Sequence, residues 1–88
     1  MLKIERITGY GDGLLLRLAG RLIGAWVPEL AFECERALAR EPRLSLDLAA
    51  VSFVDSAGAD LLRALRRRNV RLLHCSPFVA EHLGRRTS

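Results

Sequence analysis

The apolar residues between positions 26 and 40 recur at the spacing of a helix, and the segments on either side alternate like strands. From Trp26 to Leu38 the apolar positions are one, three or four residues apart, which places them on a single helical face. Pro28 near the start and Pro42 just beyond the end are typical of helix boundaries. A helix between two strands crosses over a sheet, so this pattern predicts an α/β fold.

Strand and helix patterns continue to alternate along the whole chain. We expect strands over residues 2–8, 14–18, 43–55 and 70–75, and helices over residues 26–40, 57–68 and 77–83. This order, β-β-α-β-α-β-α, predicts a four-stranded, mostly parallel sheet with an N-terminal hairpin and three helices. Asp12 and Gly13 suit the positive-φ positions of the hairpin turn. The chain has 88 residues, which predicts one domain over residues 1–88.

The composition excludes several classes of protein. Half of the residues are apolar, which is too many for a disordered chain. No apolar run reaches the ~18 residues of a membrane span, and the N-terminus lacks the pattern of a secretion signal. We therefore expect a cytoplasmic protein with no membrane span. Cys34 and Cys75 lie far apart in the sequence and predict no disulfide framework.

The net charge of the chain is positive, at +4, with a pI near 10.0. Five arginines without an intervening acid lie between positions 63 and 71: Arg63, Arg66, Arg67, Arg68 and Arg71. A basic nucleic-acid-binding protein is therefore an alternative to consider. We find no helix-turn-helix spacing, no zinc-finger ligands and no pair of stacking aromatic residues, so we do not expect nucleic acid to be the partner.

Residues 53–58, Phe-Val-Asp-Ser-Ala-Gly, join the predicted third strand to the second helix. Ser56 is predicted to be the N-cap of this helix, with the charge of Asp60 favourable in its first turn. Gly58 would let another backbone segment approach closely. Free N–H groups at the start of a helix can bind an anion, so the sequence leaves open a weak phosphate site at residues 57–59.

Partners of parallel sheets bind at the carboxyl ends of the strands. The loops expected there are residues 20–25, 54–58 and 75–78. If the sequence encodes a function, we expect its residues in these three loops.

Residues 51–62, VSFVDSAGADLL, resemble the signature of the STAS domain family, in which an apolar strand leads through Asp-Ser-Ser-Gly or Asp-Ser-Thr-Gly into a Leu-rich helix. Gly20-Arg21-Leu22 and Ser76-Pro77 also stand where the family has similar segments, so the resemblance covers nearly the whole chain. It implies a STAS-like fold of the stand-alone bacterial type. It also implies a signalling protein of transcription regulation that acts by protein–protein interaction, as anti-sigma factor antagonists do.

The third residue of the family motif is the Ser or Thr that an anti-sigma factor kinase phosphorylates, and here that residue is Ala57. The resemblance therefore implies a module that binds a regulatory partner through the 54–58 loop and the following helix without the usual phospho-acceptor. Ser56 is the alternative phosphorylation site. Arg21 and Ile23 replace acidic residues that contact the kinase in the family.

The predicted partner-binding residues are Asp55, Ser56, Ala57, Gly58, Arg63, Arg21 and Gly24. Arg63 is the base nearest to the motif, and we interpret the basic excess as the rim of the interface. Within the same family, the alternative role is that of an accessory subunit of a lipid-transport ABC ATPase. An open sheet edge would also allow two copies to pair as a homodimer.

We expect no enzymatic activity and no catalytic residues. The G-x-S-x-G pattern and the Walker A motif are both absent from the sequence. His74, Cys75 and His82 do not have the spacing of a metal site. We therefore expect neither a metal nor a cofactor.

Overall fold

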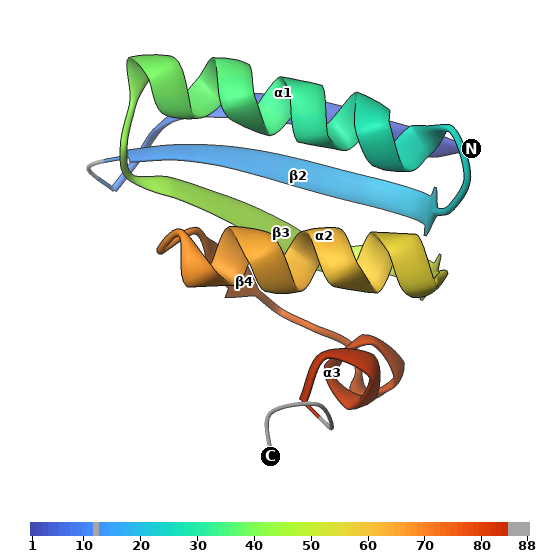
Figure 1. Cartoon of the computed structure of the whole chain (residues 1–88). Helices are drawn as coiled ribbons and strands as arrows, with labels where there is room; N and C mark the ends of the chain where they lie inside the picture. Colours follow the sequence, from blue (N-terminus) through green and yellow to red (C-terminus); the bar gives the residue numbers. More distant parts are fainter. Residues whose placement is uncertain (12, 85–88) are drawn as a thin grey trace.

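A computed structural model describes residues 1–11 and 13–84, and its elements follow the predicted order (Figure 1). The strands are β1 (Leu2–Tyr10), β2 (Gly13–Leu22), β3 (Leu44–Val54) and β4 (Arg71–Leu73), and the helices are α1 (Trp26–Arg40), α2 (Ser56–Arg67) and α3 (Pro77–Gly84). The sheet has the order β1-β2-β3-β4, with β1 antiparallel to β2 and the other pairs parallel. The predicted α/β class and mostly parallel sheet are confirmed.

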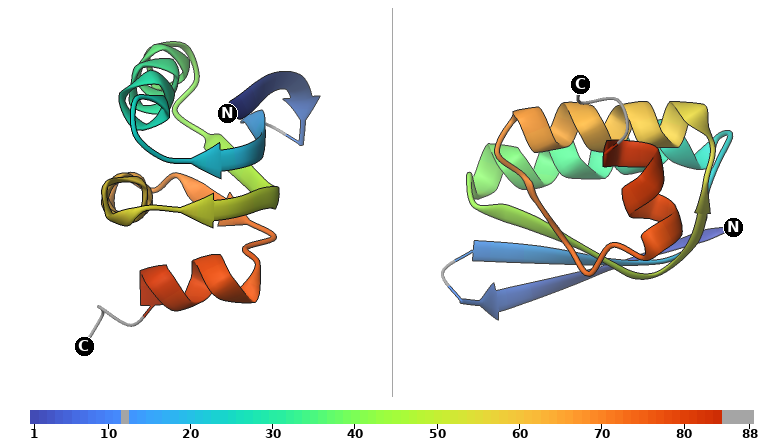
Figure 2. Two further views of the ribbon diagram at one scale, coloured as in Figure 1. Left: turned by 90° about the vertical axis from the view of Figure 1, so that its right-hand side faces the viewer. Right: turned by 90° about the horizontal axis from the view of Figure 1, so that it is seen from below.

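The helices lie on one side of the sheet. Figure 2 shows α1 and α2 side by side over the same face, with α3 beside α2 at the β4 edge. The core between the sheet and these helices is rich in leucine, and its fully buried members include Leu16, Leu18, Leu22, Leu30, Leu46, Leu48 and Leu62. In α1 the inward residues are Leu30, Cys34 and Ala37, as the spacing predicts. No helix in the described part of the chain is long and apolar enough to cross a membrane.

β3 contains two β-bulges, because its register against β2 shifts twice. At the first bulge, the Asp47 carboxylate accepts a hydrogen bond from the N–H two residues further on (3.0 Å). At the second, the Ser52 hydroxyl donates to the carbonyl of Gly20 (3.3 Å). As a result Val51 and Val54 are both buried although they are three residues apart, which a regular strand would not allow.

The N-terminal hairpin is longer than predicted. Backbone pairing continues to Tyr10 and Gly13, beyond the apolar alternation on which the prediction relied. Gly11 has positive φ (56°), whereas Gly13 does not, and Asp12 lies outside the described residues. Gly13 is needed for a different reason, since a Cβ there would lie 2.4 Å from the carbonyl oxygen of Arg43. The prediction of positive φ at Gly13 was therefore wrong.

Two residues whose backbone has a left-handed conformation, Asn69 and His74, flank β4. Asn69 (φ 70°) ends α2 in a Schellman motif, in which its N–H donates to the carbonyl of Arg66 and the Val70 N–H donates to that of Leu65. His74 (φ 60°) lies immediately after β4. The strand is therefore shorter than the predicted residues 70–75, because the backbone at His74 cannot continue it.

α3 begins at Pro77, where Ser76 accepts a hydrogen bond from the Val79 N–H (3.2 Å). Val79 and Leu83 are buried against the rest of the core. Phe78 is exposed, and its ring contacts that of His82, with centroids 4.7 Å apart.

Candidate functional site

The side chain of Asp55 joins the β3–α2 loop to the β2–α1 loop. Its Oδ1 accepts a hydrogen bond from the Gly58 N–H (2.8 Å), and its Oδ2 accepts one from the Gly24 N–H (3.0 Å). Asp55 is thus the N-cap of α2, and the prediction that Ser56 has this role was wrong. The backbone is extended at Asp55, so its carboxylate reaches the N–H three residues further on and Ser56 becomes the first residue of the helix.

The hydrogen bonds from Gly24 and Gly58 hold the pKa of the Asp55 carboxyl below its ordinary value, because both favour the charged form. The carboxylate is therefore ionised at neutral pH. Its negative charge at the start of α2 is also favourable for the helix dipole. The carboxylate is therefore in the form that accepts both hydrogen bonds.

Gly58 and Leu22 bring the same two loops into backbone contact. A Cβ on Gly58 would lie 2.6 Å from the Leu22 carbonyl oxygen, which confirms that another backbone segment approaches this glycine closely. The same carbonyl accepts a hydrogen bond from the Asp55 N–H (3.2 Å). Gly24 has φ of 56°, a conformation that glycine adopts most easily. The two loops therefore form one structural unit.

Four residues of this unit face solvent, and we call them the loop surface: Gly24, Ala25, Ser56 and Ala57. Within the described residues the Ser56 hydroxyl makes no hydrogen bond, since Asp55 has taken the capping role. The N–H groups of Gly58 and Ala59 donate to the carboxylate and carbonyl of Asp55. Of the N–H groups of residues 57–59, those of Gly58 and Ala59 are therefore not free to bind phosphate.

Arg63 lies near the loop surface in sequence, but it points toward α3. Its side chain is only 20% exposed, pairs with Asp60 and donates to the carbonyl of His82 (2.9 Å). Asp60 lies beyond the first turn of α2. The prediction that its charge is favourable in that turn was therefore wrong. The end of α3 packs over the Arg63 side chain, so it does not face solvent beside the loop surface. Arg21 is exposed at the end of β2.

A pair of exposed phenylalanines lies next to the loop surface, and the sequence prediction missed it. Phe53 and Phe78 are each 42% exposed, and their rings stack with centroids 5.4 Å apart. They come from the end of β3 and the start of α3, adjacent to two of the loops expected to be functional. The bulge at Ser52 turns Phe53 away from the core, and the apolar spacing carries no signal of that bulge.

The other arginines of the basic segment lie at the opposite end of the molecule. Arg66 and Arg67 lie in the last turn of α2, Arg68 caps it, and Arg71 begins β4. α2 has 12 residues and is about 18 Å long, so its last turn lies at the other end of the helix from residues 54–58. Arg68 also forms an ion pair with Glu35 of α1. The interpretation of the basic excess as the rim of the 54–58 interface was therefore wrong.

Together, the fold and the coupled loops define a small mixed α/β domain whose distinctive surface lies at the carboxyl ends of its parallel strands. The family model of the STAS domain matches residues 2–85, and the chain belongs to this family. The resemblance inferred from residues 51–62 is thus confirmed.

Among solved structures, the fold is similar to that of the anti-sigma factor antagonist SpoIIAA in its unphosphorylated form, with a TM-score of 0.67. The two sequences are 22% identical, and the match covers 85% of this chain and 76% of the SpoIIAA chain. At this identity the likeness establishes the fold. No curated protein matches the sequence.

Proposed function

We propose that this protein is an interaction module that resembles an anti-sigma factor antagonist and binds a kinase-type anti-sigma factor through the loop surface. The observation that carries the proposal is the double hydrogen bond of Asp55 to Gly24 and Gly58, which fixes two loops as one surface. SpoIIAA, which has a similar fold, is an anti-sigma factor antagonist. The STAS family of the whole chain supports the same role.

The geometry of the loop surface suits a protein partner. Both loops are fixed by backbone hydrogen bonds before any partner binds, which lowers the entropy lost on association. Phe53 and Phe78 supply exposed aromatic area beside it, and aromatic side chains are frequent anchors of protein interfaces. Arg21 adds a positive charge at the end of β2. We propose that these three residues flank the contact with the partner.

We further propose that binding is constitutive, because Ala57 occupies the acceptor position of the family motif and has no hydroxyl. A phosphate at this position would add a charge of about −1.5 to −2 to the exposed start of α2. That charge would stand close to the ionised Asp55 and would oppose the contact with the partner. Without an acceptor, the surface stays in the binding-competent state.

The test of the proposed function is calorimetric titration with the purified anti-sigma factor kinases of the genome that encodes this chain, each with Mg²⁺ and ADP. We expect one kinase to bind the wild-type chain and to bind Ala57→Asp at least tenfold more weakly. Ala39→Asp places the same charge on an exposed position of α1 and should bind like the wild type. Equal affinity of Ala57→Asp and wild type would show that the loop surface is not the contact.

The constitutive state is tested by incubating the chain with the same kinase and Mg²⁺–ATP, followed by mass spectrometry. We expect no phosphate on the wild type and one phosphate on Ala57→Ser. Phosphate on Ser56 of the wild type would overturn constitutive binding, since the exposed Ser56 hydroxyl would then be a shifted acceptor. Ser56→Ala would identify that site.

The same titration with lipid-transport ABC ATPases of the genome tests the alternative role within the family. Binding to such an ATPase and to none of the kinases would overturn the antagonist role. The kinase role predicts the opposite result.

A further inference from the structure

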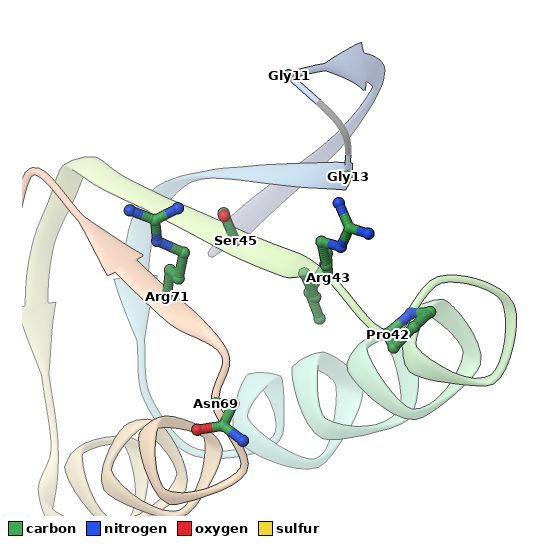
Figure 3. A pocket seen from close by; sticks show the side chains of 8 residues that line it. Gly11, Gly13, Pro42, Arg43, Ser45, Asn69 and Arg71 are labelled. Carbon is green, nitrogen blue, oxygen red and sulfur yellow. The ribbon is translucent and has the colours of Figure 1, made fainter.

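A cavity of about 260 Å³ lies at the end of the molecule opposite to the loop surface. It is bounded by the β1–β2 hairpin, the connection from α1 to β3 and the turn from α2 to β4 (Figure 3). The polar side chains of its wall belong to Arg43, Ser45, Asn69 and Arg71. None of these residues takes part in the proposed function.

Ser45 is the only buried polar residue within the described part of the chain, at 8% exposure. Its hydroxyl has no hydrogen-bond partner among those residues. A buried hydroxyl without a partner is unfavourable. No fully enclosed side-chain polar atom of the described residues is unsatisfied, so the Ser45 hydroxyl opens to the cavity. Its unused hydrogen-bonding capacity is available to a ligand.

Arg71 stands next to Ser45, because the two residues are partners in the β3–β4 register. Its guanidinium forms no ion pair with any residue of ranges 1–11 and 13–84. Figure 3 shows the Arg71 guanidinium and Arg43 on either side of Ser45, and Asn69 on the wall toward α2. A guanidinium and a hydroxyl side by side are donors that suit an oxyanion.

The charge around the cavity also favours an anion. The C-terminal ends of α1 and α2 point to this end of the molecule, and their dipoles alone would repel one. Three further arginines, Arg40, Arg66 and Arg67, lie in the last turns of these helices and offset that effect. The nearby carboxylate of Glu41 already accepts a hydrogen bond from the Arg43 N–H (2.8 Å). The described side chains near the cavity therefore carry more positive than negative charge.

We propose that this cavity binds a small phosphate monoester, with its terminal phosphoryl group between Arg71 and the Ser45 hydroxyl. A terminal phosphoryl group offers three acceptor oxygens, so it can bond to the Arg71 guanidinium and the Ser45 hydroxyl together. Ser45 is only 8% exposed, so a terminal phosphoryl group would reach it more readily than the diester backbone of a nucleic acid. The volume beyond the phosphoryl group holds the organic part of the ester. This inference does not depend on the proposed function.

The test uses ¹⁵N-labelled full chain titrated with ribose 5-phosphate, glycerol 3-phosphate and inorganic phosphate at constant ionic strength. We expect saturable amide shifts confined to the cavity wall, including Gly13, Ser45, Asn69 and Arg71, and tighter binding of an ester than of inorganic phosphate. Arg71→Met should weaken binding at least tenfold. Arg67→Met removes one charge from the same end of the molecule and should change binding less than twofold.

Ser45→Ala separates binding from folding. It removes an unpaired buried hydroxyl, so the melting temperature should stay the same or rise while ester binding weakens at least tenfold. The proposal is overturned if no probe gives saturable shifts, or if Arg67→Met and Arg71→Met weaken binding equally. Binding of a DNA or RNA oligonucleotide with shifts spread along α2, and no binding of the esters, would also overturn it.

Discussion

The carboxylate of Asp55 accepts a hydrogen bond from the backbone N–H of Gly24, 3.0 Å away and 31 residues earlier in the chain. The other oxygen of the same carboxylate caps α2. One side chain therefore sets both the start of a helix and the position of a loop that begins a different helix. The loop surface depends on this single carboxylate, and the first two predictions concern it.

Replacing Asp55 with Ser should separate its two roles. A Ser side chain can still accept the Gly58 N–H and cap α2, but it is too short to reach Gly24 as well. We expect faster hydrogen exchange at the Gly24 amide and nearly unchanged exchange in the middle of α2, measured by NMR. Asp60→Ser, an exposed change on the same helix, is the control. An unchanged Gly24 amide in Asp55→Ser would contradict the account of the coupled loops.

The contribution of Asp55 to stability should depend on pH. Its pKa in the folded chain lies below the ordinary value of about 3.8, so its carboxylate contributes fully above that value. The contribution is lost as the pH falls through the folded pKa. The melting temperature of the wild type should therefore exceed that of Asp55→Asn at pH 6, and the difference should shrink by pH 3. A difference that grows with acidification would mean that the carboxylate is not held in its charged form.

Gly58→Ala should destabilise the fold, because the new methyl group would meet the Leu22 carbonyl. Crowding of this kind costs about 1–3 kcal/mol, although alanine is otherwise favoured in helices. Urea unfolding followed by circular dichroism measures the change. Ala57→Gly in the same turn is the control, with an expected cost of about 0.5–1 kcal/mol from helix propensity alone. A Gly58→Ala variant as stable as the wild type would contradict the close backbone approach.

The two cysteines should differ in reactivity. Burial, followed by the charges of Glu35 and Glu33, raises the pKa of the Cys34 thiol to about 12. Cys75 is only partly buried. Iodoacetamide at pH 8 should therefore modify Cys75 first, and Cys34 only at the rate at which the chain opens. Mass spectrometry of the labelled protein distinguishes the two sites, and equal rates in the native protein would contradict the burial of Cys34 in the core.

Much of the fold could be predicted because local spacing reports which side of an element is buried. The positions of Leu30, Cys34 and Ala37 gave both the length of α1 and its inward face. The order of strands and helices then predicted the parallel sheet. The segment Asp55-Ser56-Ala57-Gly58 marked the junction between β3 and α2 correctly.

The details of the site could not be predicted because they depend on contacts between distant residues. Nothing near Asp55 in the sequence indicates that its carboxylate also reaches Gly24. The exposure of Phe53 depends on a bulge in β3, and bulges leave no periodic signal. The arginines after Arg63 follow the helix to the opposite end of the domain, so closeness in sequence to the motif was misleading.

The most direct test of the account is a map of the contact itself, from ¹⁵N spectra of the chain during titration with the anti-sigma factor kinase that binds it. We predict that the largest amide changes fall on Gly24, Ala25, Ser56 and Ala57, with smaller changes at Phe53 and Phe78. The resonances of amides at the cavity wall, such as that of Asn69, should not shift. Changes centred on that cavity or on the outer face of α1, with the loop surface unaffected, would contradict the proposed function.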